Sequence, residues 1–115
     1  MARTSGNPLR FLARWRRSLQ KRYFWREHLA EAIADMQRLT REMPTTEMMI
    51  SLAYLWRGKG FYESLRLRQN MLEILALTNA VKAHGPKRVC EIGTFRGGTL
   101  FIWCRVVDPE ARIFS

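Results

Sequence analysis

One segment carries most of the information about the fold, namely Arg88-Val-Cys-Glu-Ile-Gly-Thr-Phe-Arg-Gly-Gly-Thr99. Its first five residues favour a β-strand that stops at Gly93, and the apolar run 99–107 is long enough for two helical turns. Asp108 and Pro109 then make a turn before a second apolar run, residues 111–114. The order strand, glycine loop, helix, turn and strand predicts the start of a βαβ unit with two parallel strands.

The glycine loop in this segment has the chemistry of a ligand-binding turn. Glycines let bare backbone approach a ligand, and the free N–H groups at the start of a helix favour a polar or anionic group. The dinucleotide fingerprint G-x-G-x-x-G is not met, because Phe95 stands where its second glycine belongs. Two other interpretations stay open, a tight connection with no ligand and a site for another nucleotide.

The segment resembles the first motif of class I S-adenosylmethionine-dependent methyltransferases, (Asp/Glu)-x-Gly-x-Gly-x-Gly at the end of the first strand. Glu91, Gly93 and Gly97 match this frame, whereas Phe95 replaces the middle glycine. The order of residues in this motif is similar to that in a subgroup that includes the cephalosporin hydroxylase-like and small-molecule O-methyltransferases. In that subgroup a helix precedes the motif and a proline, here Pro86, stands just before the first strand.

The resemblance implies a Rossmann-like α/β fold, S-adenosylmethionine (SAM) as cofactor, and methyl transfer to an oxygen of a small molecule or sugar in the cytoplasm. Gly93 and Gly97 would line the methionine part of SAM, and Glu91 would hold its amino group directly or through water. The resemblance names no catalytic residue and no metal ligand. The implied cofactor-binding residues are Glu91, Gly93, Thr94, Phe95, Gly97, Gly98 and Thr99.

In Rossmann-like folds an acidic residue at the end of the second strand, about 20 residues after the glycine loop, binds the ribose, and Ser115 is reached before any such acid. The resemblance therefore implies the N-terminal portion of a longer, truncated enzyme, with the 115-residue chain inactive on its own. Three parts are expected: a basic amphipathic helical arm (1–26), a helical region (27–84) and the start of the SAM-binding domain (85–115).

Four helices are expected upstream, over about residues 9–25, 27–43, 47–56 and 69–82. Pro44 ends the second helix, and Thr45 or Thr46 supplies the N-cap of the third. A His-Gly-Pro sequence at 84–86 stops the fourth. The fourth helix carries Leu72, Leu75 and Ala76 on one side, and the first carries an apolar stripe of Leu12, Trp15, Leu19 and Tyr23.

The charge of the chain is concentrated at one end. Lys and Arg number 20 against 10 Asp and Glu, which gives a formal net charge of +10. The first 26 residues hold eight basic side chains and no acid, so the rest of the chain is nearly balanced. The eight are Arg3, Arg10, Arg14, Arg16, Arg17, Lys21, Arg22 and Arg26.

The basic helix admits several interpretations. In the first interpretation, the apolar stripe of the helix docks on the rest of the protein. In the second, the helix lies on an anionic membrane surface with its arginines at the headgroups. In the third, the helix binds the phosphates of nucleic acid without sequence preference. In the fourth, it is part of an organellar transit peptide. The alternative to an enzyme is accordingly a small helical protein that binds a membrane surface or nucleic acid through this helix.

Other features exclude several classes of protein. No apolar run approaches the roughly 18 residues of a membrane-spanning helix, and the apolar stretch of a signal peptide is absent from the sequence. Cys90 and Cys104 are expected to be small buried residues rather than a disulfide or a metal site. Arg96 either pairs with a carboxylate or stays solvated. The aromatic residues Trp56, Phe61 and Tyr62 either pack in the core or form part of a substrate lid.

Overall fold

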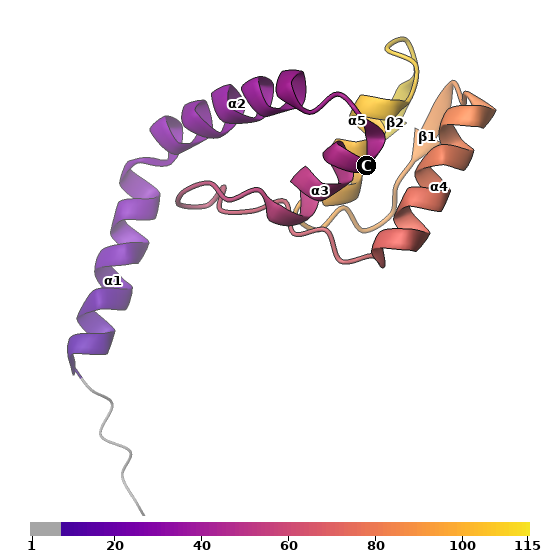
Figure 1. The fold of residues 1–115 in the computed structure, drawn as a ribbon. Coiled ribbons are helices and arrows are strands. Elements are labelled where there is room, and N and C mark those ends of the chain that lie inside the picture. The colour runs from indigo at the N-terminus through magenta and orange to yellow at the C-terminus, as the bar shows by residue number, and fades with distance from the viewer. Residues whose placement is uncertain (1–7) are drawn as a thin grey trace, which may run out of the picture.

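The computed structural model describes residues 8–115, which form five helices and a small parallel sheet (Figure 1). The combination of helices with a parallel sheet confirms the expected α/β class. Residues 1–7 of the basic arm lie outside the described part of the chain. The elements are α1 Pro8–Tyr23, α2 Trp25–Glu42, α3 Thr46–Leu55, α4 Met71–His84, β1 Arg88–Cys90, α5 Gly98–Val106 and β2 Arg112–Phe114.

The two strands pair in parallel, as predicted, with Val89 opposite Ile113 and Cys90 opposite Phe114. The backbone N–H of Glu91 donates to the carbonyl of Phe114 at 2.8 Å and extends the ladder by one bond. Val89 and Ile113 are half-buried and pack against the core, whereas the alternate side chains are exposed. Only one face of the sheet is therefore covered.

Both cysteines are exposed, so the expectation that they are buried was wrong. Cys90 alternates with half-buried Val89 along β1 and so lies on the uncovered face of the sheet. Cys104 follows the buried pair Ile102 and Trp103 on α5 but points to the opposite, solvent-facing side of that short helix. Apolar character alone did not reveal which faces have no neighbour.

The main core lies where α3, α4 and α5 meet, and its fully buried side chains are Ile50, Ile74, Thr78 and Ile102. Thr78 is satisfied there, because its hydroxyl donates to the Ile74 carbonyl at 2.6 Å. The buried face of α4 is thus not the side that carries Leu72, which is 76 % exposed. Since α4 is apolar on more than one side, periodicity did not choose between them.

Local capping signals set the helix ends much as expected. Thr45 caps α3, since its hydroxyl accepts the Met48 N–H at 3.2 Å. Asn70 caps α4 by accepting the Leu72 N–H at 2.9 Å. Gly85 ends α4 in the left-handed conformation at φ +62°.

Helix α1 extends away from the body of the protein (Figure 1). Between α1 and α2 the helical conformation is interrupted at Phe24, with φ −106° and ψ 25°. The stripe of Leu12, Trp15, Leu19 and Tyr23 is exposed, so the interpretation that it docks on the rest of the protein was wrong. The radius of gyration, 18.3 Å, exceeds the value of about 13 Å for a compact chain of this length.

Candidate cofactor site

The glycine loop runs from the end of β1 to the start of α5 and turns through left-handed backbone. Gly93 and Gly97 have φ of +80° and +83°, and Phe95 adopts φ +52° between them. The Gly97 N–H donates to the Thr94 carbonyl at 2.9 Å and closes the turn. A β-carbon on Gly93 or Gly97 would meet no atom within 4 Å. The loop therefore presents bare backbone to open space, where a ligand can approach it.

Gly98 has a different role, because it is crowded by a segment that is distant in sequence. A β-carbon there would lie 2.9 Å from the Leu67 backbone nitrogen and 3.1 Å from the Leu65 carbonyl oxygen. Real β-carbons essentially never show the first distance, and the second is shorter than nine in ten of their contacts. The absence of a side chain on Gly98 is what lets residues 65–67 cross the first turn of α5.

The connection between α3 and α4 is attached to the glycine loop by side chains. The Arg68 guanidinium lies 4.7 Å from the centre of the Phe95 ring, a cation–π distance. Gln69 Nε2 donates to Thr99 Oγ1 at 2.9 Å. These contacts hold the connection across the mouth of the loop.

Glu63 adds an ion pair to this attachment. Its carboxylate Oε1 lies 3.2 Å from Arg96 Nη1, and its Oε2 lies 3.4 Å from Lys21 Nζ on α1. The hydrogen bond from Arg96 and then the one from Lys21 hold the pKa of Glu63 below its usual value. Arg96 is therefore paired with a carboxylate, which was one of its two expected roles.

A cavity of about 310 Å³ lies between the glycine loop and this connection. The structure brings together five of the residues expected at the cofactor, whereas Glu91 and Gly97 are not among the lining residues. Sequence reasoning missed the other wall, although the alternation Leu65-Arg66-Leu67-Arg68 is typical of an extended segment with one buried side. The lining residues are Arg66, Leu67, Arg68, Gln69, Gly93, Thr94, Phe95, Gly98 and Thr99.

Glu91 stands at the carboxyl end of β1, where parallel sheets of this type place their ligands. Its side chain is half-buried, and Oε2 is enclosed without a hydrogen-bond partner among the described residues. A buried acceptor left unpaired is costly, the more so when it is charged. A hydrogen-bond donor that reached this oxygen, such as an ammonium group or a water molecule, would satisfy it.

A second, larger cavity of about 530 Å³ adjoins the glycine loop on the other side of Phe95, which lines both spaces. It is mainly apolar, and the three aromatic residues considered for a lid all line it. Trp56 is at once a core residue and a wall of this cavity. The lining residues are Ala32, Ile33, Met36, Gln37, Trp56, Phe61, Tyr62, Ser64, Leu65, Phe95 and Arg96.

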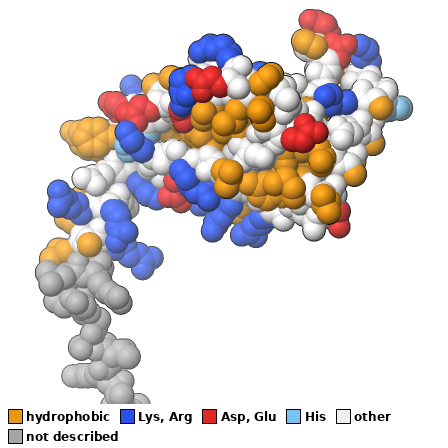
Figure 2. All heavy atoms as spheres, in the orientation of Figure 1, with side chains coloured by type: hydrophobic (Ala, Val, Ile, Leu, Met, Phe, Trp, Pro, Cys, Tyr) orange, Lys and Arg blue, Asp and Glu red, His pale blue; other side chains and the backbone are white. Residues whose placement is uncertain are grey.

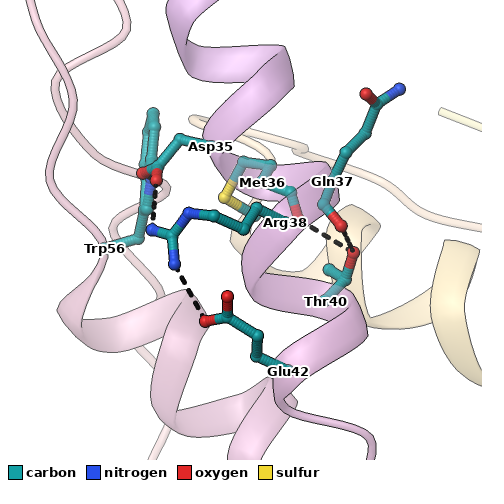
Figure 3. Close-up of polar contacts among 7 residues, drawn as sticks. All are labelled: Asp35, Met36, Gln37, Arg38, Thr40, Glu42 and Trp56. Atoms are coloured by element: carbon teal, nitrogen blue, oxygen red, sulfur yellow. Dashed lines mark hydrogen bonds and ion pairs between the residues drawn. The ribbon is translucent and has the colours of Figure 1, made fainter.

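The position of Trp56 is fixed by a polar network on α2 (Figure 3). Its indole N–H donates to Asp35 Oδ2 at 2.8 Å, and Arg38 bridges Asp35 and Glu42 at 2.7 and 2.8 Å. The hydrogen bonds from Trp56 and Arg38 lower the pKa of Asp35. The hydroxyl of Thr40, which the figure also shows, donates a hydrogen bond to the Met36 carbonyl at 2.8 Å.

No protein-family model matches the chain, and no curated protein or solved structure is significantly similar to it.

Proposed function

We propose that this chain contributes the SAM-binding loop of a Rossmann-like, SAM-dependent methyltransferase. One observation carries the proposal: a glycine loop with open, left-handed backbone follows the carboxyl end of a parallel strand, beside a buried carboxylate oxygen that has no partner among the described residues. This combination fits a ligand with a polar backbone-binding part and an ammonium group.

The residues present fit the methionine part of SAM. The carboxylate of Glu91 accepts hydrogen bonds from its ammonium group, directly or through water. Arg68, whose guanidinium lies on the Phe95 ring at the cavity wall, and exposed Arg66 supply cations for its carboxylate. When bound, SAM supplies an electrophilic methyl group that an oxygen nucleophile of the acceptor can take.

The acceptor, a small molecule or sugar, is proposed to occupy the larger cavity. Phe95 separates this space from the cofactor cavity, so an acceptor there lies next to the cofactor. The flat faces of Trp56, Phe61 and Tyr62 suit the apolar face of a ring. The catalytic base is not assigned to any residue of this chain.

The decisive experiment is an NMR titration of the 115-residue chain with SAM. We expect the amide signals of Gly93, Gly97 and Gly98 to shift, with a dissociation constant on the order of millimolar. Glu91→Gln keeps the shape of the side chain but removes its charge, and is expected to weaken binding by about ten-fold, or roughly 1.4 kcal/mol. Glu73→Gln, a change on the first turn of α4, is the matched control and leaves the affinity unchanged.

Three results would contradict the proposal. The first is that the loop amides stay unshifted at millimolar SAM. The second is that the Glu91→Gln variant binds SAM as tightly as the original chain. Alternatively, ATP shifts the same amides as strongly as SAM, which would favour a site for another nucleotide.

A further inference from the structure

Helix α1 carries an apolar stripe that the described chain leaves uncovered. Leu12, Trp15, Leu19 and Tyr23 recur at steps of three and four residues and are all exposed, Trp15 to 59 % and Tyr23 to 84 %. Apolar side chains of this size gain free energy when they leave water. We therefore expect the stripe to be buried against a partner outside the chain.

Cations are the most frequent side chains on the rest of the described helix surface. Arg14, Arg17 and Lys21 project from the side opposite the stripe, while Arg16 and Arg22 flank it. The helix contains no Asp or Glu. Long basic side chains beside an apolar stripe can extend to lipid headgroups while the stripe enters the apolar region. In Figure 2 the Lys and Arg side chains gather along the coloured part of this arm.

The contact between α1 and the body leaves the stripe free. Lys21 is the one α1 residue of the described range 12–23 that is half-buried, and its ammonium group pairs with Glu63 at 3.4 Å. Lys21 lies on the polar side of the helix, so the attachment to the body uses that side. The apolar stripe faces outward.

We propose that α1 lies in the interface of a membrane that contains anionic lipids, with its axis parallel to the surface. The helix spans 16 residues, or about 24 Å, and combines an apolar stripe with a cationic side, as surface-lying helices do. None of the described helices is long and apolar enough to cross a membrane. Charge complementarity selects anionic over neutral lipid headgroups.

Two other occupants fit the helix less well. Nucleic acid would neutralise the arginines, but a phosphate backbone offers nothing to Leu12 and Trp15. A second copy of α1 would bury the stripe, but it would bring together two helices that carry only positive charges. The membrane interface is the partner that buries the stripe and pairs the cations that flank it.

Vesicle co-sedimentation tests the proposal. The chain is mixed with vesicles of phosphatidylcholine alone or with added phosphatidylserine, at an ionic strength of about 0.1 M. We expect binding to the anionic vesicles and little to the neutral ones. Arg16→Gln with Arg22→Gln is expected to lower the partition constant by about 25-fold, since both flank the stripe and each cation near the surface contributes roughly five-fold. Leu12→Gln with Leu19→Gln is expected to lower it by more than about ten-fold.

The matched control removes two cations elsewhere. Arg88→Gln with Arg112→Gln changes the net charge equally, at exposed strand positions away from α1, and is expected to alter the partition constant by less than about two-fold. Circular dichroism of each variant in solution verifies that the fold is retained. The proposal is overturned if the anionic vesicles are not bound, if the leucine variant binds like the original chain, or if duplex DNA is bound more tightly than the vesicles at the same salt.

Discussion

Gly98 and Gly85 both flank helices, but they are glycine for different physical reasons. Gly98 opens α5 under the backbone of Leu67, where a β-carbon would be only 2.9 Å from the backbone nitrogen. Gly85 closes α4 at φ +62° in open space. Steric crowding therefore governs the first position and backbone conformation governs the second.

Substitution by Ala and by Asn distinguishes the two cases. Gly98→Ala is expected to lower the free energy of unfolding by about 1–3 kcal/mol, because a backbone segment must move, and Gly98→Asn by at least as much. Gly85→Ala is expected to cost about 1 kcal/mol for left-handed strain. Gly85→Asn should recover most of that loss, because Asn tolerates this conformation. Denaturant unfolding measures all four, and a Gly98→Ala variant as stable as the original chain would contradict the crowding.

At the scale of elements, the hydrogen bond between Asp35 and Trp56 connects α2, which lines the larger cavity, to the residue that follows α3 and lines the same cavity. Asp35 has a lowered pKa because Trp56 and Arg38 donate to its charged form. A carboxyl group whose pKa is lower in the folded than in the unfolded chain stabilises the fold above its unfolded pKa. This contribution is lost as the pH falls through the folded value.

Asp35→Ala is therefore expected to lower the free energy of unfolding near neutral pH by roughly 1 kcal/mol. The loss is limited because the Asp35 side chain is 37 % exposed and water can replace part of the bond. The difference from the original chain should shrink as the pH falls below about 4. Urea unfolding over a pH series measures it, with Glu110→Gln at an exposed turn as the control. A difference that stays constant down to strongly acidic pH would argue against the contact.

The sequence predicted those elements that are specified locally. Thr45, the turn at Gly85, and the strand, loop and helix around Gly93 all depend on neighbours a few residues away, and their positions were confirmed. Five of the seven expected cofactor residues also lie together along one cavity, and Glu91 and Gly97 do not line it.

Contacts between distant segments were not predictable from local pattern. The second wall of the cofactor cavity comes from residues 66–69, which the sequence marked only as a connection. Their placement depends on the contact between Leu67 and Gly98, and no periodicity reports such a contact. The exposure of Cys90 likewise depends on a sheet face that has no neighbour.

At the scale of the whole molecule, the two-stranded sheet is open at its edges and on one face. Ile92, directly after β1, is 96 % exposed, and Phe114 in β2 is 54 % exposed. Open edges and exposed apolar side chains favour association between chains. The chain is therefore expected to associate with itself as its concentration rises.

Ile92→Lys is expected to reduce this association while changing the free energy of unfolding by less than about 0.5 kcal/mol, because the side chain contributes almost nothing to the core. Sedimentation velocity over a concentration series measures the effect. Leu77→Lys, at an exposed position on α4, makes the same chemical change away from the sheet and should leave the association as it was. Equal association of the Ile92→Lys variant and the original chain would place the contact elsewhere.

The shared carboxylate of Glu63 has a mechanical consequence. The angle of α1 is set by the backbone at Phe24 and by the pair of Lys21 with Glu63, which is exposed to water and therefore weak. Among the described side chains, those of α1 residues 12–23 take no part in the apolar core. The angle between α1 and the body can therefore change, for example against a flat surface, without opening the core. A tilt that separated Lys21 from Glu63 would leave this carboxylate to Arg96 alone, so the ion pair at the glycine loop would change with the angle of α1.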